Sequence, residues 1–95
     1  MEWDERKRRE NLRKHGLDFA DAGEVMNARY RMDVPVVRCG ERRTLSIAYS
    51  LGHLAVLVVV HTDRGGTPRI ISFRRASRLE REAYYEWLEN EFDDP

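Results

Sequence analysis

Residues 53–61 read HLAVLVVVH, a run of seven apolar residues between two histidines. A continuous apolar run of this length is typical of a β-strand that is covered on both faces, at the centre of a sheet. The run is about a third as long as a membrane-spanning helix has to be. We therefore expect the sheet to be built outward from His53–His61.

The segments on either side of this strand alternate between apolar and polar residues, as strands with one exposed face do. Tyr30–Val34 alternates up to Pro35, which restricts that strand to a sheet edge or ends it. Thr44–Tyr49 and Arg69–Arg74 alternate as well. The turn signals that separate the strands are short, which favours antiparallel neighbours. They are Cys39-Gly40, Leu51-Gly52 and Asp63-Arg64-Gly65-Gly66.

Helices are predicted at both ends of the chain. Asp4 caps a first helix that runs to about His15 and stops at Gly16. Asp18 opens a short second helix, whose apolar face consists of Phe19, Ala22, Val25 and Met26. A capping box at residues 77–80 begins the last helix. Its predicted buried stripe consists of Leu79, Ala83, Tyr84, Trp87 and Leu88.

The chain has 95 residues, which is enough for a single domain over residues 1–95. We expect an α+β fold with two N-terminal helices, a four-stranded antiparallel sheet and a C-terminal helix, the helices lying largely on one face. A lone cysteine, Cys39, and an N-terminus without an apolar core indicate a cytoplasmic protein without a membrane contact.

The net charge is zero, but the charges are unevenly distributed. Five arginines and no lysine lie between residues 63 and 78, whereas residues 79–95 hold seven acids and only Arg81. Guanidinium groups bind phosphate through two parallel hydrogen bonds, so the segment is suited to binding phosphate groups. The alternative is a solvated rim in which the arginines pair with the acidic C-terminal segment. The five are Arg64, Arg69, Arg74, Arg75 and Arg78.

Several stretches resemble the BrnT toxin family. They span about residues 3–84 in the family's order and spacing. The stretches are Trp3-Asp4, Asn11, Lys14-His15-Gly16, Phe19, Gly40-Glu41-Arg42, Val60-His61-Thr62, Arg69–Ser77, Glu80-Arg81 and Tyr84.

The resemblance implies a RelE-like fold and a ribonuclease toxin of a type II toxin–antitoxin pair, which inhibits translation by cleaving RNA. It also implies a partner, a BrnA-like ribbon-helix-helix antitoxin. That antitoxin would neutralise the toxin in a hetero-oligomer and bind the DNA of its own operon.

RNA can be cleaved without a metal, because its 2′-hydroxyl is a nucleophile beside the scissile phosphate. The three histidines and Cys39 lack the spacing of a zinc site. We therefore expect no cofactor and no metal. The products would carry a 2′,3′-cyclic phosphate and a 5′-hydroxyl.

Four residues are the candidates for catalysis. Arg74 shares a strand face with Ser72 and would bind the scissile phosphate. Glu80 would act as general base, would orient an arginine, or serves only as a helix cap. Tyr84 would stack on a base or donate a proton, or packs in the core. His61 would act as acid or base, or is structural.

Six further residues are candidates for RNA binding: Lys14, His15, Arg64, Arg69, Arg75 and Arg78. Lys14 and His15 end a helix with a single apolar residue, which suggests contact with RNA or with an antitoxin. The main rival function is a non-catalytic module that docks an antitoxin or another partner. A nucleic-acid binder without cleavage is disfavoured by the zero net charge.

Overall fold

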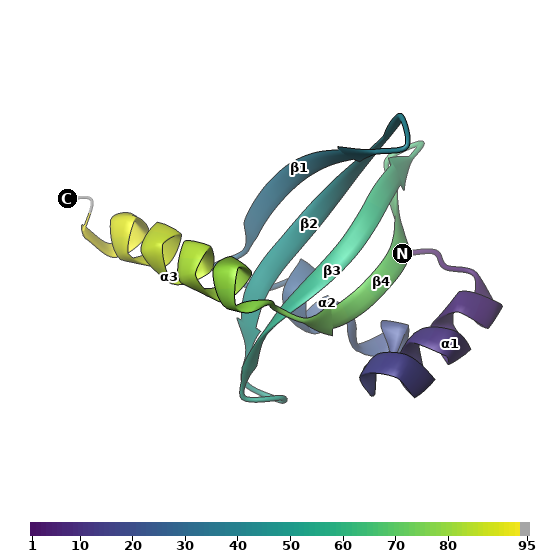
Figure 1. The fold of residues 1–95 in the computed structure, drawn as a ribbon, viewed down its shortest axis with the longest axis horizontal. Coiled ribbons are helices and arrows are strands. Elements are labelled where there is room, and N and C mark those ends of the chain that lie inside the picture. Colours follow the sequence, from purple (N-terminus) through teal and green to yellow (C-terminus); the bar gives the residue numbers. More distant parts are fainter. Residues whose placement is uncertain (94–95) are drawn as a thin grey trace.

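The computed structural model describes residues 1–93, and its elements follow the predicted order of helices, sheet and helix (Figure 1). Two α-helices and a 3₁₀ turn precede the four strands, and one long helix follows them. The elements are α1 (Glu5–His15), η1 (Phe19–Asp21), α2 (Gly23–Met26), β1 (Met32–Arg38), β2 (Glu41–Ser50), β3 (Ala55–Arg64), β4 (Thr67–Arg75) and α3 (Arg78–Asp93).

The sheet is antiparallel throughout, in the order β1-β2-β3-β4. The apolar run forms β3, between β2 and β4, so its central position is confirmed. Pro35 lies inside β1, the edge strand, where a missing N–H breaks no ladder. The opposite edge, β4, is covered near its start, because Glu2 exchanges backbone hydrogen bonds with Pro68 and Ile70 at 2.9 Å. The α+β class is confirmed.

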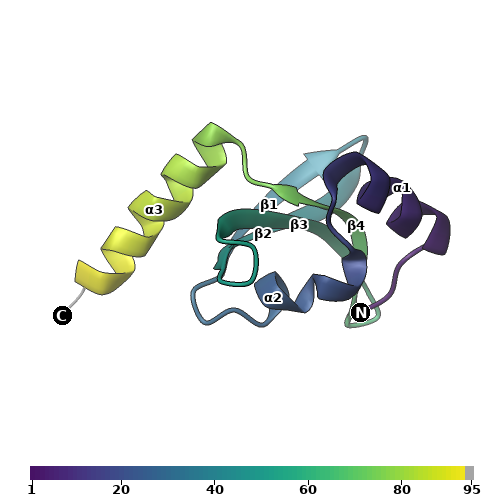
Figure 2. The same ribbon diagram turned by 90° about the horizontal axis from the view of Figure 1, so that it is seen from below.

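Helices cover both faces of the sheet, and the prediction that they lie largely on one face is wrong (Figure 2). Leu57 and Val59 of β3 point to the core beneath η1 and α2, around Phe19. The alternate residue Val58 points to the other face, where Tyr84 of α3 packs. The apolar run of β3 therefore supplies both cores, because successive side chains of a strand point to opposite faces.

The second predicted helix is shorter than expected and begins as a 3₁₀ turn. Asp18 caps it as predicted, accepting a hydrogen bond from the N–H of Ala20 at 2.9 Å. Phe19, Ala22 and Val25 are buried at intervals of three residues. Three residues per turn is the period of the 3₁₀ turn, and the segment continues as the short α-helix α2.

A polar side chain attaches α1 to the sheet. Its caps are as predicted, with Asp4 at the start and Gly16 in the left-handed conformation at the end. Asn11 is the buried residue of α1; its amide nitrogen donates to the carbonyls of Phe73 and Leu17 at 2.8 and 2.9 Å. Its amide oxygen accepts from the N–H of Phe73 at 3.1 Å. The helix therefore lies along β4 although it lacks an apolar stripe.

The capping box of α3 is confirmed, but its predicted stripe is only partly buried. The N–H of Ser77 donates to Glu80 at 2.7 Å, and the Ser77 hydroxyl accepts from the N–H of Glu80 at 3.2 Å. Tyr84 is buried, whereas Leu79 and Ala83 are exposed. The helix leaves the end of the sheet and projects away from it, so only its middle turns find apolar partners (Figures 1 and 2).

Within residues 1–93, none of the helices combines the length and the apolar composition that crossing a bilayer requires.

Candidate RNA-binding groove

A register shift in β4 determines on which face of the sheet the side chain of Arg74 lies. Val60 pairs with Ser72 and His61 pairs with Ile70, so one extra residue of β4 forms a bulge between them. Ser72 and Arg74 then lie opposite Val60 and Val58. They share the sheet face on the side of α3, as the alternation of the sequence predicts.

Arg74 is held by Glu80 through two parallel hydrogen bonds. Its Nη1 and Nη2 donate to the two carboxylate oxygens at 2.7 and 2.9 Å. The Arg74 guanidinium, with the N–H of Ser77, lowers the pKa of Glu80 to about 2. A carboxylate this acidic is a poor proton acceptor at neutral pH, so of the predicted roles the geometry favours orienting the arginine and capping the helix.

Arg74 lines a cavity of about 330 Å³ on the face of the sheet that it shares with Ser72. Arg38 of β1 and Arg43 of β2 line it too, so arginines from three strands converge. Nε of Arg43 is 3.0 Å from Glu41. Sequence reasoning missed Arg38 and Arg43, although the period of two across their hairpin places both on the face of Val36.

A second cavity, of about 270 Å³, continues this surface across β4 to α1. Lys14 and His15 line it from the helix, and Ser72 lines both cavities. The sequence candidates Lys14, His15 and Arg74 are therefore brought together. We call this surface the basic groove and define it by Lys14, His15, Arg38, Arg43, Ser72 and Arg74.

The imidazole of His15 favours its neutral form in the basic groove. Burial lowers its pKa below the usual value of 6.5, and the nearby positive charges of Lys14 and Arg74 lower it further. A histidine that is neutral at pH 7 has an unprotonated ring nitrogen, which is the form in which an imidazole can act as a general base. The groove therefore combines a positive surface for phosphate with a proton acceptor.

His61 does not lie in the basic groove. It is buried on the opposite face, where its Nε2 lies 2.7 Å from the hydroxyl of Ser46. That hydroxyl is 2.7 Å from Asp33, which Arg31 holds with hydrogen bonds of 2.8 and 3.0 Å. Burial and then Arg31 lower the pKa of His61. The sheet separates this polar network from Arg74, which favours the structural alternative.

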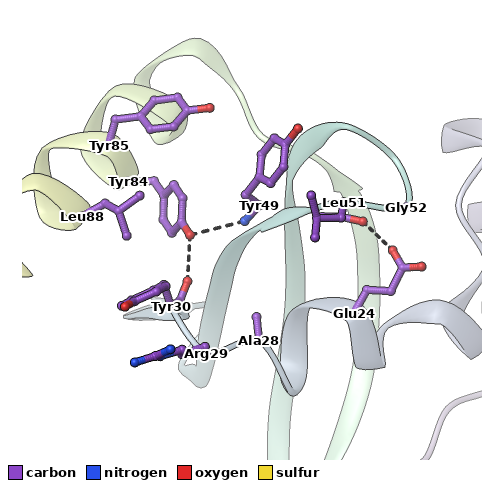
Figure 3. Close-up of a pocket in the computed structure, with 11 residues that line it drawn as sticks. Glu24, Ala28, Arg29, Tyr30, Tyr49, Leu51, Gly52, Tyr84, Tyr85 and Leu88 are labelled. Carbon is purple, nitrogen blue, oxygen red and sulfur yellow. Dashed lines mark hydrogen bonds between the residues drawn. The ribbon is translucent and has the colours of Figure 1, made fainter. Parts of the chain in front are cut away.

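Tyr84 is a core residue and not part of the groove. It is 2% exposed, and its hydroxyl donates to the carbonyl of Tyr30 at 2.7 Å (Figure 3). The same oxygen accepts from the N–H of Tyr49 at 3.4 Å. Burial raises the pKa of the phenol. Its packing and its hydrogen bonds account for Tyr84 without any contact with RNA.

The remaining arginine candidates divide between the two ends of β4. Arg75 and Arg78 follow Arg74 at the junction with α3, where both are exposed. Arg64 lies at the tip of the β3–β4 hairpin, and Arg69 is 3.8 Å from Glu2 at the strand edge. Among the residues that the structure describes, two of the five pair with acids of α3, Arg74 with Glu80 and Arg78 with Glu82. The alternative interpretation, a solvated rim of arginines paired with acids, therefore applies to only part of the arginine-rich segment 63–78.

Sequence comparison agrees with the resemblance seen in the residues. A search of curated proteins finds no match. The family model of the ribonuclease toxin BrnT, of type II toxin–antitoxin systems, matches residues 3–80. That range includes α1, the whole sheet and the first residues of α3, and hence every residue of the basic groove. The chain belongs to the BrnT family of ribonuclease toxins.

Proposed function

We propose that this chain is an endoribonuclease that cleaves RNA in the basic groove by attack of the 2′-hydroxyl on the adjacent phosphate, without a metal. The observation that carries the proposal is the placement of Arg74, fixed by Glu80, on the same groove as a neutral His15. We further propose that residues 1–95 form one RelE-like domain acting in the cytoplasm.

Arg74 would bind the oxygens of the scissile phosphate. Two of its N–H groups are committed to Glu80, which fixes the plane of the guanidinium before RNA arrives. The transition state carries more negative charge on these oxygens than the substrate does, so a fixed cation stabilises it preferentially. Arg38, Arg43 and Lys14 would add positive potential for the flanking phosphates.

His15 would accept the proton of the 2′-hydroxyl. The new bond joins the 2′-oxygen to phosphorus, and the bond from phosphorus to the 5′-oxygen breaks. The leaving 5′-oxygen takes a proton from water. Arg75 and Arg78, beside the groove, would hold the RNA backbone downstream of the cleaved bond. Arg64 and Arg69 lie nearer the other end of β4 and would contact only a longer RNA.

The family places the chain in a toxin–antitoxin pair, so an antitoxin partner accompanies the RNA substrate. We propose that this partner is a BrnA-like ribbon-helix-helix protein, through which the complex binds its operon.

Treatment with a chelator tests the metal-independent mechanism. We expect the purified chain to cleave single-stranded RNA at the same rate with and without EDTA, leaving a 2′,3′-cyclic phosphate and a 5′-hydroxyl. The products are identified by sequencing after two ligations, one that requires a 2′,3′-cyclic phosphate end and one that requires a 5′-hydroxyl end. Loss of cleavage in EDTA, or products with a 5′-phosphate, would contradict the mechanism. No cleavage by folded protein would favour the non-catalytic binding module.

The pH profile tests His15. Because the neutral imidazole is the active form, kcat/KM should rise with pH and reach half its maximum below pH 6.5. His15→Gln should lose this dependence and about 10²- to 10⁴-fold in rate. His53→Gln is the matched control, since His53 pairs with Glu24 outside the groove. An unchanged profile in His15→Gln would remove His15 from proton transfer.

A further inference from the structure

A cavity that shares no residue with the basic groove lies between α3 and the end of β2 (Figure 3). Its volume is about 730 Å³. It is bounded by α3, by the end of β2 with the turn after it, and by the segment that follows α2. Its lining includes Glu24, Tyr49, Ser50, Leu51, Tyr85 and Leu88.

The mouth of this cavity exposes large apolar side chains. Leu51 is 81% exposed, Tyr85 46% and Tyr49 39%. Leu54, in the same turn, is 75% exposed. Contiguous exposed apolar surface on a small protein marks an interaction site more often than a solvated face.

Several polar groups at the cavity are already hydrogen-bonded within the protein. Ser50 donates its hydroxyl to Glu24 at 2.5 Å, and Nδ1 of His53 is 2.8 Å from the same carboxylate. The Tyr84 hydroxyl bonds two backbone groups. Small-molecule sites usually offer a few free, convergent polar groups, whereas Glu24, Ser50 and the Tyr84 hydroxyl are committed to partners within the protein. Together with the exposed leucines and tyrosines at its mouth, this suits the cavity to apolar side chains.

The helix beside the cavity carries a strong negative charge. From Glu82 to the end of the chain there are six acidic residues and no basic one. Of these, Glu86, Glu89 and Glu91 make no ion pair within residues 1–93. An apolar cavity flanked by unpaired carboxylates complements a helix with one apolar and one basic face.

We propose that this cavity and α3 form the docking surface for an amphipathic, basic helix of a protein partner, which inserts apolar side chains between Leu51 and Tyr85. The antitoxin that a type II toxin requires is the protein that would supply it. The proposal does not depend on how, or whether, the basic groove cleaves RNA.

Binding of model peptides to the purified full-length chain tests the surface. The probe is a fluorescein-labelled 18-residue helix of leucine and lysine, with leucine at helical spacing. Two controls keep its length: one replaces lysine by glutamate, and one keeps the composition but scrambles the leucine stripe. We expect the lysine helix to raise fluorescence anisotropy at concentrations where neither control does.

Variants of the chain locate the binding. Leu51→Asp and Tyr85→Asp should each weaken the lysine helix at least about tenfold, because each buries a charge in place of an apolar contact. Val37→Asp is the matched control, because Val37 is 71% exposed on β1 and does not line the cavity. Circular dichroism of each variant verifies folding. The double variant Glu86→Lys, Glu89→Lys should bind the glutamate helix instead.

Three outcomes would overturn the proposal. One is equal binding of the scrambled peptide. A second is binding that the Leu51 and Tyr85 variants leave unchanged. A third outcome is that the wild-type chain self-associates in sedimentation, that Leu51→Asp is monomeric, and that no peptide binds. This result would assign the surface to a second copy of the chain. RNA cleavage by Leu51→Asp at the wild-type rate would separate this site from the basic groove.

Discussion

Arg74→Lys is expected to lower kcat/KM for RNA cleavage by about 10²- to 10³-fold, although the positive charge remains. Lysine is a point charge and cannot bind Glu80 and a phosphate through one rigid plane of N–H groups. Arg74 meets both carboxylate oxygens, at 2.7 and 2.9 Å, so its orientation depends on that plane. Growth during induction and the cleavage rate of purified protein measure the loss.

The control for this variant is Arg9→Lys, an equivalent change at an exposed arginine of α1 that does not line the basic groove. It should cleave RNA as the wild type does. Thermal unfolding of both variants checks that Arg74→Lys remains folded, because Glu80 loses part of its ion pair. Wild-type cleavage by folded Arg74→Lys would show that the guanidinium plane fixed by Glu80 is not needed for catalysis.

Asn11→Ala is expected to lower the free energy of unfolding by about 2–4 kcal/mol. The Asn11 side chain is buried and makes three hydrogen bonds to the backbone of Phe73 and Leu17. Alanine would leave those backbone groups without partners, and buried polar groups without partners are costly. Urea unfolding followed by circular dichroism gives the change.

Leu12→Ala is the control for the second variant. Leu12 neighbours Asn11 on α1 and is 40% exposed. If apolar contacts attached α1 to the sheet, removing the Leu12 side chain would destabilise the protein more than removing the Asn11 side chain. The structure instead attaches α1 through Asn11, so Leu12→Ala should change stability by less than Asn11→Ala. Equal effects would contradict the attachment of α1 through polar bonds. Asn11→Ala should also reduce cleavage at temperatures where it is folded, because His15 is carried by the same helix.

Local signals in the sequence were enough to predict most of the elements. The apolar run of β3, Pro35 at the edge, and the caps at Asp4 and Gly16 each act over a few neighbouring residues. The capping box of α3 is equally local. Such patterns predict where a strand or helix begins and what borders it, since backbone conformation responds mainly to nearby side chains. The family resemblance added the ribonuclease assignment, which no periodicity contained.

The candidate site was predicted less completely, because its members come from separate elements. Arg74 and Glu80 were both named, but their pairing is a contact between β4 and α3. Arg38 and Arg43 reach the groove only through the register of the β1–β2 hairpin. Tyr84 has the chemistry of a catalytic residue, and only its burial and hydrogen bonds favour a structural role.

The order of the elements and the central position of β3 follow from the sequence alone, which left open whether Pro35 lies on an edge strand or ends the strand. The folded structure was needed to see that helices cover both faces, that His61 lies across the sheet from Arg74, and that Asn11 brings His15 to the groove. Side-chain alternation assigns residues to two faces without saying which element covers each. A contact between positions 11 and 73 leaves no periodic trace in either segment, so it becomes visible only once the chain is folded.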